Sequence, residues 1–327
     1  MNNPAFPAAG KDRPVISFGI GCYNSQITMK TTYKGWRYPA RLLLATFLSL
    51  VLALAVTMLW FSYRQAMSYV HPVRGYATGK MLKTNGIDYQ EIELITEDGL
   101  KLSAWYTPPN ATRGAVILVA HGYGDKRAEV FHLLFASHGY GVLAWDFRAH
   151  GNSEGDFTSL GYYETMDAKA ALDFALAQPG VQHIGAWGGS MGAVTMIRAA
   201  AQYPEIEALV ADSPFSTLED EMELRVPIPV MRSLIRVFAG WETGVSPELV
   251  RPVDDIGRIS PRPVFIIQSM DDGMVPLDSA QRLFDAAGEP RQLWTESGAP
   301  HMNMYAYYKT RYTKQVIKFF NNYLPGE

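Results

Sequence analysis

The sequence predicts an α/β fold, a mostly parallel β-sheet flanked by helices with a small cap insertion, preceded by one N-terminal transmembrane helix. Three observations support this fold. Strands and helices alternate from about residue 85 onward, short strands such as Ala115–Ala120 are apolar throughout, and Leu42–Phe61 is a long uncharged segment. Alternating strands and helices indicate a parallel sheet, and strands that are apolar throughout are typical of a sheet covered on both faces.

The composition is that of a globular protein and excludes several classes of function. Of 327 residues, 48% are hydrophobic and 19% are charged, with a net charge of -3. A nucleic-acid partner is not expected, because phosphate binding needs a basic surface. The single cysteine, Cys22, excludes an intrachain disulfide and a cysteine-rich metal site. The residues imply no metal and no organic cofactor.

The segment Leu42–Phe61 has the length and composition of a membrane anchor. At a rise of about 1.5 Å per residue it spans a hydrocarbon core of about 30 Å. A buried core helix is the alternative, but such a helix usually has a polar face. More basic residues precede the segment than follow it: Lys30, Lys34, Arg37 and Arg41 against Arg64 and Arg74. This asymmetry predicts a single-pass cell-membrane protein with a cytoplasmic N-terminus and an extracytoplasmic domain.

We therefore expect four regions: a cytoplasmic tail (1–41), an anchor (42–63), a linker (64–84) and the α/β domain (85–327). Residues 1–28 show no periodicity, and Met29 is an alternative translation start because a basic stretch follows it. A cleaved signal peptide would give the same orientation. The apolar segment is long for a signal peptide and no A-x-A site follows it closely, which favours an uncleaved anchor.

The predicted elements of the domain begin with a hairpin. Tyr89–Thr96 and Leu100–Tyr106 alternate in polarity on either side of an Asp-Gly turn. The remaining expected strands are Ala115–Ala120, Gly141–Phe147, Ile184–Trp187, Ala208–Ala211, Val264–Gln268 and Gln292–Thr295. The expected helices are Ala128–Ser137, Glu164–Ala177, Ala193–Ala201 and Lys309–Tyr323.

One stretch, Pro214–Pro261, contains several prolines and no clear strand. We expect it to form the cap insertion, because ligands bind beyond the carboxyl ends of parallel strands. A purely structural excursion is the alternative.

The pattern G-x-S-x-G occurs twice, at residues 151–155 and 188–192. A nucleophile elbow with this pattern must lie on a sharp turn between a strand and a helix. Ser190 directly follows a predicted strand and directly precedes a predicted helix. Ser153 instead follows the polar Arg-Ala-His and is followed by Asp-Phe-Thr (156–158), with no helix directly after it. Ser190 is therefore the predicted nucleophile. The alternative for Ser190 is a tight turn that only packs helix against strand.

A serine hydroxyl needs a base, and the base needs an acid to orient it. Behind such an elbow the chain order is serine, acid, histidine. His301 is the only histidine after Ser190, which predicts it as the base. Asp271 and Asp272 both follow a predicted strand and are both candidates for the acid, with Asp212 a weaker rival.

Acyl transfer also needs two backbone N–H groups to stabilise the oxyanion. One is predicted at Met191, directly after the serine. The other is predicted at Tyr123 in His121-Gly-Tyr-Gly-Asp125, where two glycines let the main chain approach a substrate closely. His121 itself is expected to be a structural hydrogen-bonding residue.

Taken together, these motifs resemble those of the α/β-hydrolase superfamily over roughly residues 70–325. The likeness is strongest to membrane-anchored bacterial serine hydrolases of the serine aminopeptidase-like and Bem46-like groups. It implies that Asp272, in Asp-Gly-Met-Val-Pro, is the acid rather than Asp271, and that Ser153 lies in an H-G-x-S loop that does not supply the nucleophile. The chain departs from this pattern at Pro300, where the family usually has glycine. The proline restricts the backbone of the preceding residue, Ala299. Its H-G-Y-G-D loop also differs from the H-G-G-G of many lipases.

The resemblance and the residues together predict hydrolysis of an acyl bond, most readily a carboxylic ester, through an acyl-enzyme on Ser190. The expected partners are a small-molecule acyl substrate and the lipid bilayer. A serine peptidase or amidase on the same triad is one alternative, and a non-catalytic membrane-tethered binding domain is the other. Serine at the elbow argues against epoxide-hydrolase or dehalogenase chemistry, which uses aspartate there.

Overall fold

A computed structural model describes residues 37–324 of the chain. The possible start at Met29, Cys22 and the basic residues Lys30 and Lys34 lie outside the described residues. The chain divides into two compact units, Met1–Ala53 and Leu54–Glu327.

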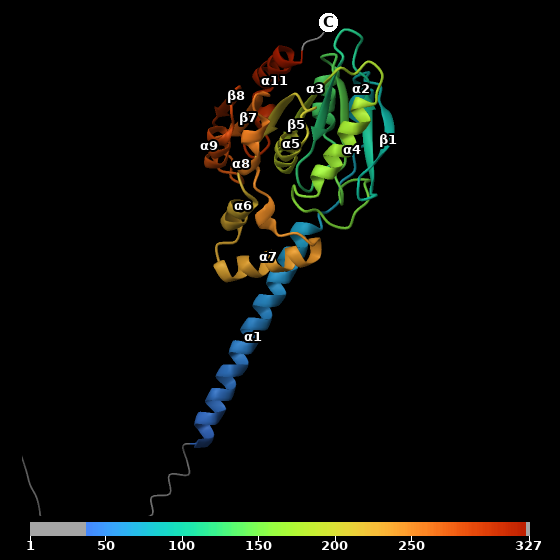
Figure 1. Ribbon diagram of the computed structural model, residues 1–327. Coiled ribbons are helices and arrows are strands. Elements are labelled where there is room, and N and C mark those ends of the chain that lie inside the picture. Colours follow the sequence, from blue (N-terminus) through green and yellow to red (C-terminus); the bar gives the residue numbers. More distant parts are fainter. Residues whose placement is uncertain (1–36, 325–327) are drawn as a thin grey trace, which may run out of the picture. The chain divides into compact units, whose positions relative to one another are not determined.

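The second unit is built around one eight-stranded sheet with strand order β1-β2-β4-β3-β5-β6-β7-β8 (Figure 1). The first two strands form an antiparallel hairpin, β2 pairs antiparallel with β4, and all other pairs are parallel. The mostly parallel sheet predicted from the sequence is thus confirmed. The strands are β1 (Gln90–Ile95), β2 (Lys101–Thr107), β3 (Ala115–Ala120), β4 (Gly141–Trp145), β5 (His183–Gly189), β6 (Ala208–Asp212), β7 (Val264–Ser269) and β8 (Arg291–Glu296).

Helices cover both faces of the sheet. Alternate residues of β3 belong to two separate hydrophobic clusters, with Val116 and Leu118 on one side and Ile117 and Val119 on the other. This alternation follows from the two-residue period of a strand and explains why β3 is apolar throughout. The first side is covered by α4 (Glu164–Leu176), α5 (Met191–Gln202) and α9 (Leu277–Ala286), and the second by α3 (Glu129–Ala136), α10 (Met304–Tyr307) and α11 (Lys309–Tyr323).

Helix α1 runs from Arg37 to Val70. Within the described residues it is the one helix that is long and apolar enough to cross a membrane, judged by length and composition. It continues seven residues beyond the predicted end of the anchor at Tyr63, so the predicted linker (64–84) begins as helix and ends with the short α2 (Lys80–Thr84). Ala66 and Val70, four residues apart on one face, are buried in a cluster with Phe215. These residues belong to the second unit, so the last turns of α1 are part of its core.

The stretch between β6 and β7, where the sequence predicts a cap, is helical. It contains α6 (Leu218–Arg225), α7 (Pro229–Thr243), the 3-10 turns η1 (Pro247–Leu249) and η2 (Ile256–Ile259), and α8 (Pro252–Asp255). Thr217 caps α6 by accepting a hydrogen bond from the Asp220 N–H at 3.0 Å. A proline starts α7 and the left-handed Gly244 (φ 74°) ends it, the usual signals at the two ends of a helix. The sequence prediction missed these helices because the prolines interrupt the apolar periodicity.

Candidate active site

Ser190 lies on the turn that joins β5 to α5. Its backbone has φ 51° and ψ −117°, a conformation that costs a non-glycine residue about 1–3 kcal/mol. Two neighbouring glycines are required there, because a Cβ on Gly188 would collide with the Gly192 carbonyl and a Cβ on Gly192 would collide with the Ala120 carbonyl. The Ser190 N–H donates to the Asp212 carbonyl at 2.8 Å, which fixes the turn to the neighbouring strand. The strained turn holds the hydroxyl above the end of the sheet.

His301 and Asp272 meet this hydroxyl from two later loops. The distance from His301 Nε2 to Ser190 Oγ is 3.0 Å, and that from His301 Nδ1 to Asp272 Oδ2 is 2.7 Å. The other carboxylate oxygen of Asp272 accepts the N–H groups of Met274 and Val275 at 2.8 and 2.9 Å. The structure therefore brings together three residues that lie far apart in the sequence.

The electrostatics of Asp272 favour its charged form. Burial by itself would raise the pKa of Asp272, but the hydrogen bonds from His301 and from the Val275 and Met274 N–H groups outweigh it, and the pKa falls below its ordinary value. Gln268 on β7 also donates to Asp272 Oδ2 at 3.0 Å. This carboxylate is held in place from several directions at once.

The other two candidate acids, Asp271 and Asp212, have different hydrogen-bond partners. Asp271 is exposed and accepts a hydrogen bond from the Gly298 N–H, which ties its loop to the loop of His301. Asp212 is buried, which raises its pKa to about 6, and it accepts hydrogen bonds from the hydroxyls of Tyr312 at 2.7 Å and Ser213 at 2.9 Å. Neither has a hydrogen bond to the imidazole.

The loop after β3 lies directly beside Ser190. A Cβ built on Gly122 would lie 3.6 Å from the Ser190 Cβ. Among the described residues, no hydrogen-bond acceptor is recorded for the N–H groups of Tyr123 and Met191, so both are available to a ligand. His121 is buried, which lowers its pKa to about 4, and its Nε2 accepts the Phe147 N–H at 3.0 Å. This neutral imidazole supports the loop.

Ser153, in the other G-x-S-x-G copy, is buried, and among the described residues its hydroxyl has no hydrogen bond to a histidine. Its hydroxyl donates to the Asp146 carbonyl at 2.5 Å and accepts the Ser103 N–H at 2.9 Å. Only 2% of the residue is exposed. The Ser153 hydroxyl therefore donates and accepts hydrogen bonds within the protein.

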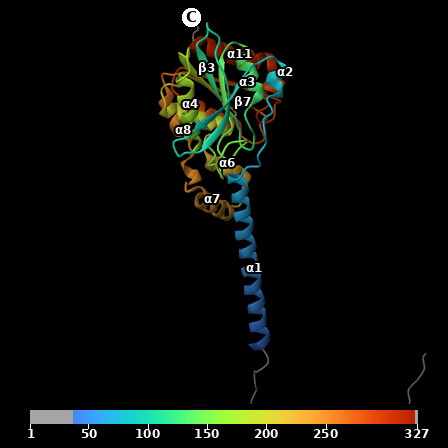
Figure 2. The same cartoon turned by 90° about the vertical axis from the view of Figure 1, so that its right-hand side faces the viewer.

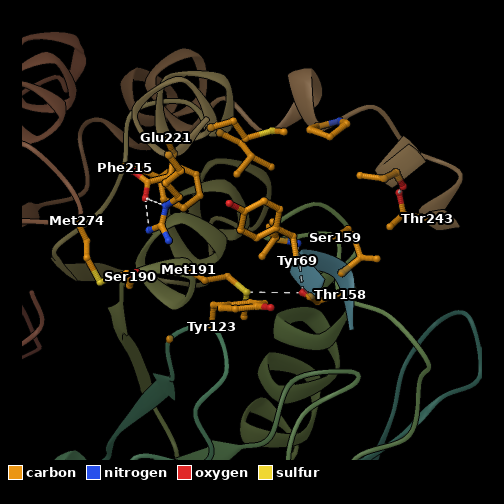
Figure 3. A pocket seen from close by; sticks show the side chains of 18 of the residues that line it. Tyr69, Tyr123, Thr158, Ser159, Ser190, Met191, Phe215, Glu221, Thr243 and Met274 are labelled. Carbon is orange, nitrogen blue, oxygen red and sulfur yellow. Dashed lines mark hydrogen bonds and ion pairs between the residues drawn. The ribbon is translucent and has the colours of Figure 1, made fainter. Parts of the chain in front are cut away.

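An apolar cavity of about 290 Å³ opens above Ser190. In Figure 3 it lies between Ser190, Met191 and Tyr123 on one side and Phe215 and Glu221 on the other. The cap supplies a further part of the wall, through side chains of α6 and α7. A site of this kind, largely apolar with a few converging polar groups, is typical of small-molecule binding.

Two parts of the site were missed by the sequence prediction. Tyr69 and Val70, at the end of α1, line the cavity although the sequence predicts a linker there. The four-residue spacing of Ala66 and Val70 was the available signal. Glu221 and Arg225 also line the cavity, joined by an ion pair on α6, and no sequence motif marks them.

Comparison with known proteins identifies the family. The family described as Serine aminopeptidase, S33 matches residues 111–249. The Mycobacterium tuberculosis protein Rv2307c is 30% identical over 218 residues, which cover 65% of this chain and 72% of that protein. The chain belongs to the α/β-hydrolase superfamily. Both the enzyme class and the fold predicted from the sequence are thereby confirmed.

Two other relatives of this α/β-hydrolase are of the esterase and lipase type. The Pyrococcus furiosus esterase Pf2001 has 27% identity and a TM-score of 0.66, with 79% of this chain and 99% of that chain covered. The lysophosphatidylserine lipase ABHD12 of Mus musculus is 29% identical over 202 residues. That alignment covers 57% of this chain but only 49% of the lipase.

Proposed function

We propose that this α/β-hydrolase is a serine esterase of lipophilic acyl esters, with Ser190 as nucleophile, His301 as base and Asp272 as the acid that orients the imidazole. The observation that carries the proposal is the continuous contact from Asp272 through His301 to a serine hydroxyl that faces an apolar cavity. The esterase and lipase relatives support the same substrate class.

In the proposed reaction the acyl chain occupies the cavity. His301 Nε2 takes the proton of Ser190 as Oγ attacks the carbonyl carbon, and the N–H groups of Tyr123 and Met191 stabilise the oxyanion. The alcohol leaves with the proton from His301. Water, activated by the same imidazole, then releases the acid and restores the serine. The lowered pKa of Asp272 keeps it ionised, which stabilises the transient imidazolium.

A fluorophosphonate probe tests the nucleophile. We expect it to label the wild type and Ser153→Ala but not Ser190→Ala, because only a serine activated by a base attacks the phosphorus. Circular dichroism of each variant checks that it is folded. Labelling that disappears in folded Ser153→Ala and persists in Ser190→Ala would refute the assignment.

A serine aminopeptidase on the same triad is the second candidate. It is favoured by the family description and by Glu221, a cavity-lining carboxylate. Burial raises the pKa of Glu221, and no hydrogen-bond partner is recorded for its Oε2 among the described residues. Such an oxygen could accept a hydrogen bond from a substrate ammonium group. We expect p-nitrophenyl acyl esters to be cleaved and aminoacyl p-nitroanilides not; anilide cleavage that Glu221→Gln abolishes would reverse the choice.

We further propose that α1 anchors the protein in the cell membrane, with a cytoplasmic N-terminus and an extracytoplasmic domain. The proposal is supported by the uncharged segment Leu42–Phe61 and by the basic residues that precede it. Protease digestion of intact spheroplasts should degrade the domain. Its protection until the cells are lysed would contradict this orientation.

A further inference from the structure

Helix α7 of the cap has apolar side chains on its outer side as well as on its inner side. Ile235 and Ala239 are buried and line the cavity above Ser190. On the other side Val230, Val237 and Trp241 are 53%, 58% and 84% exposed. A surface helix of a globular protein normally places polar residues there.

The outer side chains form one continuous stripe. Together with the half-buried Leu234, these residues stand at positions 230, 234, 237 and 241, the spacing that keeps residues on a single helical face. We call these four residues the outer stripe of α7. None of them is charged, and the flanking Arg232 and Arg236 form ion pairs with glutamates. The outer stripe is therefore an uncharged apolar surface on the outside of the cap.

Beside the outer stripe, α7 contacts the part of α1 that belongs to the same unit. Residues 54–61 of α1 include the exposed Leu54, Leu59 and Trp60. Directly after them the ring of Tyr63 packs edge-on against Phe238 of α7, with centroids 5.6 Å apart. Figures 1 and 2 show α7 crossing the last turns of α1.

A second contact lies one turn further along α7, near its C-terminal end. His71, one residue after α1, pairs with Glu242 at 3.0 Å, so α7 is attached to the end of α1 at two points. Where α1 leaves a bilayer, such a helix would lie along the bilayer surface. A helix in that position needs an apolar outer face, and tryptophan is favoured at the membrane interface.

We propose that α7 is an interfacial helix whose outer stripe inserts into the lipid bilayer surface, while its inner side forms the wall of the active-site cavity. This inference rests on the proposed membrane anchoring by α1 and extends it to the cap. A lipophilic ester would then pass from the bilayer into the cavity beside α7 with little exposure to water.

Fluorescent labels on the full-length protein test the insertion. With Cys22 replaced by serine, a nitrobenzoxadiazole label is attached to Val237→Cys, to Leu54→Cys on α1, or to Ile95→Cys, an exposed control on β1. The protein is reconstituted in phosphatidylcholine vesicles with or without doxyl-labelled phosphatidylcholine. We expect quenching at positions 237 and 54 but not at 95.

The pattern of quenching separates the two proposals. Quenching at 54 with none at 237 would overturn the insertion of α7 and leave the anchor standing. Absence of quenching at both positions would overturn both the membrane anchor and the insertion of α7. A blue-shifted label at 237 that lipid does not quench would indicate that a second copy of the chain covers the outer stripe, which also overturns the inference.

Activity provides an independent readout. The double variant Val237→Gln/Trp241→Gln should lose about tenfold in hydrolysis of a long-chain ester embedded in vesicles. Hydrolysis of a water-soluble p-nitrophenyl ester should stay within about twofold, because neither side chain lines the cavity. Ile95→Gln is the matched control and should affect neither. Equal losses on both substrates, or no loss on either, would overturn the inference.

Discussion

The two G-x-S-x-G copies of this chain share a pattern and differ in almost every structural respect. Ser190 lies between a strand and a helix at φ 51°, half-buried, with its hydroxyl toward a cavity and an imidazole. Ser153 lies in an irregular loop, with its hydroxyl bonded to main-chain groups on both sides. The pattern alone specifies a glycine-flanked serine. The elements before and after it decide whether the hydroxyl faces a substrate or supports a loop.

The glycines also differ in their use. Gly188 makes room for the helix that follows the turn, and Gly192 makes room for the end of β3. Gly151 and Gly155 both adopt positive φ, and Gly155 packs closely on the backbone of Ala149. The same spacing of glycines therefore shapes the turn of the proposed nucleophile at Ser190 and a compact loop at Ser153.

The largest expected effect separates the two serines by activity. Ser190→Ala should lower kcat for a p-nitrophenyl ester by about a million-fold, as removal of a triad nucleophile does. Ser153→Ala should stay within about tenfold of the wild type at a temperature where it is folded. Similar kcat values for the two variants would remove the functional difference between the copies.

The second prediction concerns the acid that the Ser190 copy requires. Asp272→Asn should lower kcat by about ten-thousand-fold, because the amide favours the wrong imidazole tautomer. Asp271→Asn is the matched control and should cost far less, since its carboxylate contacts the Gly298 N–H rather than the imidazole. Initial rates of both variants measure this. Equal losses would show that the two carboxylates share the role.

A third prediction uses the pH dependence of the Ser153 loop. Burial lowers the pKa of His150, in that loop, to about 4. The unfolded chain binds a proton below about 6.5 while the native state does not, so this group makes stability fall as pH is lowered from about 6.5 to about 4. The loss amounts to at most about 3 kcal/mol. In His150→Asn the decline of Tm over that window should be shallower than in the wild type; an identical slope would contradict this assignment.

The smallest effect is on stability at neutral pH. Ser153→Ala should lower the free energy of unfolding by about 1–3 kcal/mol, because the Ser103 N–H and the Asp146 carbonyl lose a buried partner. Urea titration followed by circular dichroism measures the change. Ser153→Thr, which keeps the hydroxyl, is the control for the hydrogen bond. An unaltered midpoint for the alanine variant would show that the loop does not depend on this serine.

The sequence predicted most of the sheet because its strands satisfy local rules. The continuous apolar strand Ala115–Ala120 and the final helix Lys309–Tyr323 have the bounds that the sequence predicted. The cap was predicted only as an interval, since the prolines that begin α7, η1 and α8 interrupt the apolar periodicity of the stretch. The cavity-lining role of Tyr69 had no local signal beyond the spacing of Ala66 and Val70, because it depends on segments far away along the chain.

The sequence by itself determined the fold class, the contrast between Ser190 and Ser153, and His301 as the only downstream histidine. These depend on periodicity and chain order, which are local properties. Only the tertiary structure showed which carboxylate contacts the imidazole, that the end of α1 belongs to the cavity wall, and that α7 has an apolar face on either side. Such facts are decided by distances between remote segments, which the packing of helices against the sheet fixes and no short stretch of sequence encodes.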